Sequence, residues 1–102
     1  MTINIITNDA EKALIEFAGE LDTVAAQGLT DKLSPVMTDA GKAITIDFSN
    51  LEYISSAGMR VLLQLNKNAM EKGGSVSIVG MSEDILQIFQ LVGFDKLFSI
   101  NQ

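Results

Sequence analysis

Residues 43–79 read AITIDFSNLEYISSAGMRVLLQLNKNAMEKGGSVSIV and hold the pattern that decides the fold. Apolar and polar residues alternate over 43–48, which predicts a strand with one buried face. Residues 57–72 carry an apolar stripe at helical spacing, and Gly73-Gly74 ends the helix as a left-handed cap requires. A further apolar run over 76–79 predicts a second strand. Two strands separated by a helix are expected to be parallel, with a right-handed crossover.

The flanking segments extend this unit in both directions. Residues 3–7 and 13–18 predict two short strands joined by a polar hairpin loop, followed by a helix that Asp22 caps. On the other side, Ser82 caps a third helix that ends at Gly93. The element order is β-β-α-β-α-β-α. It predicts a small α/β domain with a mixed, mostly parallel four-stranded sheet, in which the first strand is antiparallel at an edge.

Side-chain patterns add three details to this prediction. The polar half of the 43–48 strand indicates that helices cover mainly one face, because a doubly wound sheet needs strands apolar on both faces. Pro35 is expected to bend the first helix or to start a separate last turn. The apolar side chains of residues 94–100 are expected to pack back on the core. With no linker or repeat in the chain, residues 1–102 are expected to form one domain.

The composition limits what such a domain does. The chain has 102 residues, seven Lys and Arg against thirteen Asp and Glu, a net charge of −6, and neither His nor Cys. Zinc–thiolate sites, disulfides and the commonest general base are therefore excluded. Phosphate-binding glycine motifs are also missing, and a Ser-His-Asp triad lacks its histidine. We predict a protein-binding module that is not an enzyme and needs no cofactor or metal.

Charge and hydropathy also bear on partners and location. A net charge of −6 disfavours nucleic acids and anionic membrane surfaces as partners, and with the small size it favours a monomer. Residues 1–8 lack the basic segment and cleavage site of a signal peptide. No apolar run approaches the roughly 20 residues that span a bilayer. A cytoplasmic location is therefore expected.

Two predicted loops follow the carboxyl ends of parallel strands, where α/β proteins bind ligands and partners. Residues 19–22 follow the second strand and residues 49–58 follow the third, so the loops lie side by side if these strands are neighbours. The later loop brings Ser55 and Ser56 to the start of the strongest helix. The unpaired N–H groups and positive dipole end there tolerate a phosphate, so a serine can be phosphorylated without breaking its helix.

Each of these residues also has a simpler structural interpretation. A serine at a helix start is usually an N-cap, and this role is the commoner one for Ser55 or Ser56. Gly58 can serve close packing of the helix on the sheet. Met59 can be an adaptable contact residue, although methionine more often fills a core.

The charged residues leave alternatives open as well. Arg60 shares a helix face with Ser56, so it can pair with a phosphate there, with Glu52, or with solvent alone. Asp22 is expected to act as a cap. Glu20 and Asp22 together are too few carboxylates for an all-oxygen calcium site.

Three segments, taken together in order and spacing, resemble a known family. They are Gly19-Glu20-Leu21-Asp22, the run from Ile46-Asp47-Phe48-Ser49 through Tyr53-Ile54-Ser55-Ser56-Ala57-Gly58-Met59-Arg60-Val61-Leu62, and Val92-Gly93-Phe94-Asp95-Lys96-Leu97-Phe98. The chain resembles the STAS family, the sulphate transporter and anti-sigma factor antagonist domain. It is most similar to the stand-alone bacterial anti-sigma factor antagonists. The resemblance implies a small α/β domain with a mixed four-stranded sheet.

The resemblance also implies a phosphorylation switch. Antagonists of this family bind an anti-sigma factor that is also a serine kinase, and binding releases the sigma factor. The kinase phosphorylates a serine at the start of the helix after the third strand, which ends the interaction, and a separate serine phosphatase reverses it. That position is Ser56 here, with Ser55 as second choice, because Ser55 and Ala57 stand where many switching members have Asp and Ser or Thr. The implied partner-binding residues are Glu20, Asp22, Thr23, Ser55, Ala57, Gly58, Met59 and Arg60.

Two other functions stay open at this point. The same domain can be an adaptor or scaffold subunit of a transporter or signalling complex, without phosphorylation. An enzyme or small-ligand binder is the third possibility, and it would require a large pocket with convergent polar groups.

Overall fold

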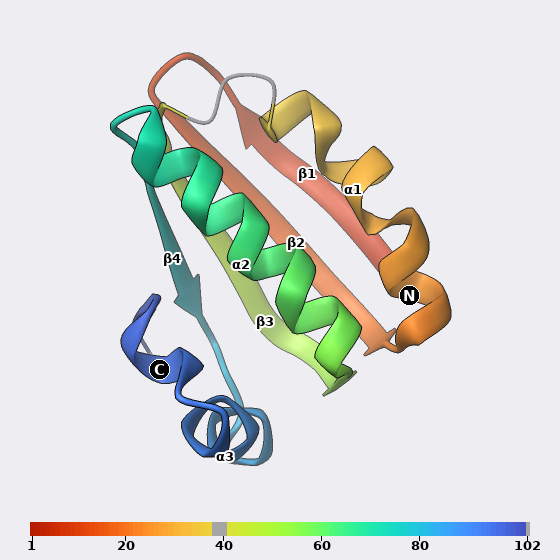
Figure 1. The fold of residues 1–102 in the computed structure, drawn as a ribbon. Helices are drawn as coiled ribbons and strands as arrows, with labels where there is room; N and C mark the ends of the chain where they lie inside the picture. The colour runs from red at the N-terminus through yellow and green to blue at the C-terminus, as the bar shows by residue number, and fades with distance from the viewer. Residues whose placement is uncertain (38–40, 102) are drawn as a thin grey trace.

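The computed structural model describes residues 1–37 and 41–101 as one sheet with helices packed on it (Figure 1). The strands are β1 (Thr2–Asn8), β2 (Lys12–Leu21), β3 (Ala43–Ile54), β4 (Ser75–Val79) and β5 (Ser99–Asn101). The helices are α1 (Thr23–Met37), α2 (Ser56–Glu71), α3 (Glu83–Leu91) and the short 3-10 helix η1 (Phe94–Lys96). Within the described residues, no helix has the length and apolar character needed to cross a membrane.

The strands lie in the sheet in the same order as in the chain, β1-β2-β3-β4-β5. β1 pairs antiparallel with β2, whereas β2, β3, β4 and β5 pair parallel with one another. The predicted parallel set with an antiparallel edge strand is therefore confirmed.

The helices pack on one face of this sheet, as the alternation predicted. Phe17 of β2 and Phe48 of β3 are fully buried on that face, whereas Glu16 and Asp47 beside them are only half-buried. The Phe17 and Phe48 rings lie 5.7 Å apart between centroids, and Phe89 of α3 packs against Phe48 at 6.3 Å. Figure 1 shows α1 and α2 lying across the same face of the sheet. The core is therefore the layer between this face and the helices.

β3 is longer than predicted, which corrects the expected loop over 49–58. The strand continues to Ile54 and pairs with β2 through Gly19 opposite Leu51 and Leu21 opposite Ile54. The register shifts between Glu16 and Ala18 and again between Gly19 and Glu20. Local alternation fails at these irregularities, so the pattern indicated a loop, but the extended β2 supplies backbone partners that keep the chain in the sheet.

A fifth strand replaces part of the expected apolar tail. Residues Ser99–Asn101 pair parallel with β4, with Ile100 opposite Ile78. Phe98 packs back on the core at 6% exposure, as expected, whereas Leu97 stays 47% exposed. Three residues are too few to show an alternating pattern, so the sequence did not reveal this strand.

The predicted helix ends are confirmed. Oδ1 of Asp22 accepts a hydrogen bond from the Ala25 N–H of α1 at 2.8 Å. Oγ of Ser82 accepts one from the Ile85 N–H of α3 at 3.3 Å. Gly93 follows α3 with a left-handed φ of 77°, a conformation that glycine adopts without a steric cost.

Pro35 lies inside α1, which runs through it to Met37, so of the two expected outcomes, a bend or a separate last turn, the separate last turn is wrong. Proline has no N–H to donate, which leaves the Asp31 carbonyl without its usual helical donor. The Ser34 hydroxyl donates to that carbonyl oxygen at 2.9 Å instead. This side-chain bond replaces the missing backbone bond and allows the helix to continue.

Candidate functional site

The two segments predicted to meet at the carboxyl edge of the sheet do meet. Glu20 lies opposite Tyr53 and Leu21 opposite Ile54 where β2 and β3 end. The Ser55 N–H donates to the Leu21 carbonyl oxygen at 2.8 Å. The start of α2 is thereby tied to the segment that leads into α1.

The two serines at the start of α2 have different environments. Ser55 has an extended backbone, and its Oγ accepts a hydrogen bond from the Gly58 N–H at 3.1 Å. Its side chain is buried, at 7% exposure. Ser56 is the first residue of the helix and is exposed, and its hydroxyl has no hydrogen-bond partner within the described part of the chain. The cap is therefore Ser55, and the accessible hydroxyl is Ser56.

Gly58 allows α2 to approach β2 closely. A Cβ atom at this position would lie 2.6 Å from Cγ of Leu21 and 3.3 Å from the Leu21 carbonyl oxygen. A side chain at this position would force either Leu21 or the helix to move. The packing interpretation of Gly58 is confirmed, and this contact fixes where Ser56 stands relative to β2.

The remaining residues predicted to bind a partner divide by exposure. Met59 is 4% exposed and fills the core. Ala57 is half-buried, and Gly58 is buried with Ser55. The residues available for direct contact are exposed: Glu20, Asp22, Thr23, Ser56 and Arg60.

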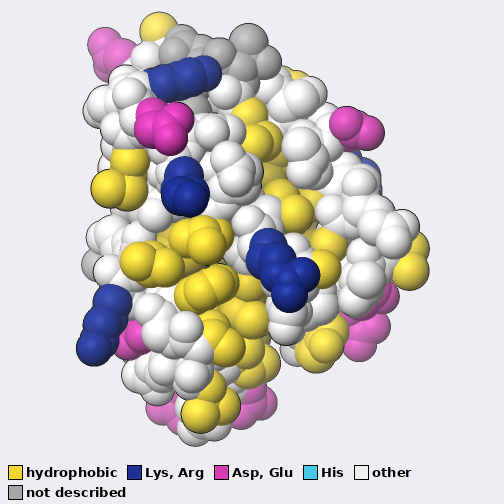
Figure 2. Space-filling model, in the orientation of Figure 1, with side chains coloured by type: hydrophobic (Ala, Val, Ile, Leu, Met, Phe, Trp, Pro, Cys, Tyr) yellow, Lys and Arg dark blue, Asp and Glu magenta, His cyan; other side chains and the backbone are white. Residues whose placement is uncertain are grey.

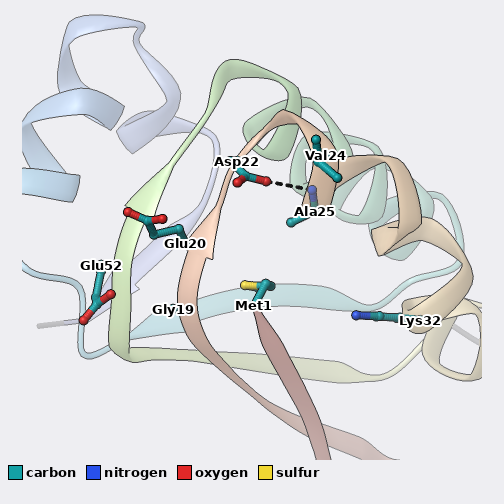
Figure 3. Close-up of a pocket in the computed structure, with 8 residues that line it drawn as sticks. All are labelled: Met1, Gly19, Glu20, Asp22, Val24, Ala25, Lys32 and Glu52. Carbon is teal, nitrogen blue, oxygen red and sulfur yellow. Dashed lines mark hydrogen bonds between the residues drawn. The ribbon is translucent and has the colours of Figure 1, made fainter.

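Two of these exposed residues, Glu20 and Asp22, line a hollow of about 520 Å³ (Figure 3). Figure 3 shows Glu20 and Glu52 reaching it from neighbouring strands, with Asp22 and Val24 at the start of α1. The full lining is Met1, Gly19, Glu20, Asp22, Val24, Ala25, Lys32 and Glu52. No group of three or more His, Cys, Asp or Glu residues in the described chain is arranged to hold a metal ion.

Comparison with known proteins identifies the family. A family model described as "Mlab, STAS domain" matches residues 6–99. The chain belongs to the STAS domain family. The family resemblance seen in the sequence is therefore confirmed.

The relatives of this STAS domain include anti-sigma factor antagonists. It is 28% identical over 102 residues to the anti-sigma-B factor antagonist of Bacillus subtilis (strain 168), an alignment covering 99% of this chain and 93% of that protein. An anti-sigma factor antagonist from Mycobacterium paratuberculosis has a similar structure, with a TM-score of 0.81, 24% identity, and coverage of 98% and 86%. The structure of the phosphorylated form of the Bacillus cell fate determinant SpoIIAA is also similar. Its TM-score is 0.73 at 20% identity, and the alignment covers 99% of this chain and 92% of that chain. At these identities the two structures establish a shared fold.

Sequence reasoning missed five residues that line the hollow of this STAS domain. Glu52 was considered only as a partner for Arg60, because the segment around it was interpreted as a loop. Met1, Val24, Ala25 and Lys32 come from the chain start and α1, and no local motif marks them. Val24 is 76% exposed, an unusual position for an apolar side chain, and this exposure depends on how α1 packs.

At the opposite end of the sheet, an acidic residue, Asp9, has a structural role. In the turn between β1 and β2, Oδ1 of Asp9 accepts hydrogen bonds from the Glu11 N–H at 2.8 Å and the Lys12 N–H at 2.9 Å. These bonds stabilise the ionised carboxylate and hold the pKa of Asp9 below its ordinary value. This carboxylate orders a turn, far along β2 from Ser56.

Proposed function

We propose that this STAS domain is an anti-sigma factor antagonist whose partner is a cytoplasmic anti-sigma factor with serine kinase activity. Binding of the domain releases the sigma factor, and phosphorylation of Ser56 ends the interaction until a serine phosphatase removes the phosphate. One observation carries this proposal. Ser56 offers an exposed hydroxyl at the start of a long helix, whereas the Ser55 hydroxyl is buried and already serves as the cap.

The relatives support both parts of the proposal. The Bacillus subtilis protein that matches nearly the whole chain is an anti-sigma-B factor antagonist. A protein of the same fold, SpoIIAA, exists in a phosphorylated form. The chain itself contains no histidine or cysteine, so a kinase and a phosphatase would supply the chemistry.

A phosphate on Ser56 would change the surface without breaking the helix. It would add roughly −1.5 to −2 charges at the N-terminal end of α2, where the helix dipole and free N–H groups accommodate an anion. α2 has no acidic residue in its first turn, so nothing there already compensates the dipole. Arg60 is exposed one turn further along and can approach the phosphate. The partner would then face a more negative surface.

Phosphopeptide mapping of the protein isolated from its native host tests the proposal. We expect phosphate on Ser56, its loss in Ser56→Ala, and its retention in Ser55→Ala. Phosphate on Ser55, or none under conditions that change transcription, would contradict the assignment to Ser56.

A second function is favoured by the residues on either side of Ser56. Ser55 and Ala57 stand where many switching members have Asp and Ser or Thr. These two residues favour a scaffold subunit that is not phosphorylated. Neighbouring genes for a serine kinase and phosphatase would support the switch, whereas genes for transporter subunits would support the scaffold.

A further inference from the structure

An apolar surface extends from the outer side of α2 to the C-terminal segment. Met70 of α2 is 65% exposed, and Leu63 lies one heptad before it and is half-buried. Asn66 between them is buried and donates from Nδ2 to the Leu97 carbonyl oxygen at 2.9 Å. This bond places Leu97, itself 47% exposed, beside the helix. We call this area the α2 surface. It consists of the apolar residues Leu63, Met70 and Leu97 and the neighbouring basic residues Arg60, Lys67 and Lys96.

Three basic side chains border this apolar area, and the exposed Glu71 follows Met70 at its end. Arg60 and Lys67 are exposed and lie one heptad apart on α2, while Lys96 is exposed on η1. The chain has only seven basic residues against thirteen acidic ones, so three of the seven are gathered here. Figure 2 shows hydrophobic side chains collected over the region between α2 and the C-terminal segment, with Lys and Arg side chains around them.

The α2 surface is continuous with the proposed switch. Ser56 lies one heptad before Leu63, so it stands at the N-terminal end of the same side of the helix. Arg60 lies between them, one turn from each. The acidic hollow built on β2, β3 and α1 has the opposite charge character. The two areas therefore differ in the partner chemistry they suit.

We propose that the α2 surface binds an amphipathic helix of the partner, with apolar side chains flanked by Asp or Glu. Leu63, Met70 and Leu97 would lose contact with water on binding, and the surrounding Arg60, Lys67 and Lys96 select an acidic flank. A basic flank would face like charges and would be rejected. The assignment of this helix to the anti-sigma factor rests on the proposed function. A phosphate on Ser56 would repel the same acidic flank, and phosphorylation would thereby weaken binding of the partner.

Two synthetic helical peptides test the surface without a known partner. They share one Leu and Met stripe and differ only in having Glu or Lys flanks. Titration into ¹⁵N-labelled protein is expected to shift the amide signals of Leu63, Lys67 and Leu97 with the Glu peptide. We expect the Glu peptide to bind at least about fivefold more tightly than the Lys peptide, a ratio typical of a few exposed charge pairs. Equal binding, or shifts confined to the acidic hollow, would overturn the proposal.

Charge reversal on α2 gives the matched comparison. Arg60→Glu and Lys67→Glu, made as separate single variants, are each expected to weaken the Glu peptide about threefold and to strengthen the Lys peptide. Lys12→Glu makes the same kind of change on β2, outside the α2 surface, and is expected to alter neither affinity by more than about twofold. All three positions are exposed, and an unchanged amide spectrum elsewhere verifies the fold. If Lys12→Glu acts as strongly as the α2 reversals, only net charge matters and the proposal is wrong.

The same peptides separate this inference from the proposed function. Ser56→Glu is expected to weaken the Glu peptide at least about twofold, whereas Thr30→Glu on α1 leaves it unchanged. If Ser56 proves unmodified in the host, a preference for the Glu peptide still supports the α2 surface. If Ser56 is phosphorylated but the wild type does not discriminate between the peptides, the inference fails while the proposed function stands.

Discussion

α2 and α3 start in nearly the same way and differ at the residue after the cap. Ser55 and Ser82 both accept a hydrogen bond from the N–H three residues later. α3 continues with Glu83 and Asp84, whereas the first turn of α2 contains no acidic residue. The positive end of the α3 dipole is already compensated, and that of α2 is not. Capping and charge compensation are therefore separate functions, and α2 leaves the second one free for a modification.

The largest expected effect on stability comes from a substitution at the third residue of α2. α2 has Gly58 there, against Leu21, where α3 has the buried Ile85. Gly58→Ala is expected to lower the free energy of unfolding by about 1 to 3 kcal/mol, because the new Cβ overlaps Leu21. Urea denaturation measures this value.

Gly28 in α1 is the matched control for that substitution. A Cβ at Gly28 meets nothing within 4 Å, so Gly28→Ala is expected to stabilise the protein by roughly 0.5 to 1 kcal/mol. If the two variants behave alike, close packing is not the reason for glycine at the start of α2.

The two caps should be nearly equivalent when removed. Ser55→Ala and Ser82→Ala are each expected to cost about 1 kcal/mol of stability, because each leaves a first-turn N–H without its acceptor. Ser56→Ala is expected to change stability by less than about 0.5 kcal/mol, since its hydroxyl caps nothing. Thermal unfolding of the three variants compares them directly. A Ser56→Ala loss as large as that of Ser55→Ala would show that Ser56 is the structural residue.

Charge compensation at the helix start should transfer from α3 to α2. Ser56→Asp is expected to raise stability by about 0.3 to 1 kcal/mol at low salt, and Glu83→Ser to lower it by a similar amount. Both effects should shrink as salt screens the dipole. Unfolding curves at low and high ionic strength provide the measurement. A destabilising Ser56→Asp at low salt would contradict the view that this helix start accommodates a phosphate.

The smallest expected effect on stability concerns Asp9, which accepts backbone hydrogen bonds as the two serine caps do but with a charged carboxylate. It bonds two N–H groups in the β1–β2 turn, and its pKa is lowered from the ordinary value of 3.8. A lowered folded-state pKa contributes stability that is present above pH 3.8 and is lost as pH falls through the folded-state value. Because asparagine cannot ionise, Asp9→Asn should slightly lower the stability near neutrality and remove this part of its loss below pH 3.8, so that the acid limb of the stability profile becomes flatter. An unaltered acid limb in this variant would show that the turn bonds do not favour the ionised form.

Local patterns were sufficient where each residue's surroundings are set by its near neighbours. The alternation over 43–48 located the centre of β3, and Asp22 and Ser82 were identified as caps because capping bonds span three residues. The same local rule could not decide between Ser55 and Ser56. That choice depends on Gly58 packing against Leu21, which sets where the helix begins.

Longer-range pairing explains the remaining differences. Strand β3 reaches Ile54 only because β2 continues beside it, and β5 exists only because β4 offers a free edge. The hollow lined by Glu20, Glu52 and Val24 likewise joins residues from separate elements. The local sequence of one segment does not indicate which distant segments will pair or pack with it.

Side-chain periodicity, caps and motif spacing are local properties of the chain, so they were sufficient to predict the α/β class, the parallel order, the one-sided helical layer and the family. The tertiary structure alone decided which serine is buried as a cap and which is exposed. It also brought Leu97 against Asn66, completing an apolar surface with a basic border on an acidic protein. Exposure and surface charge depend on which elements pack together, so they emerge only when the sheet and its helices are assembled.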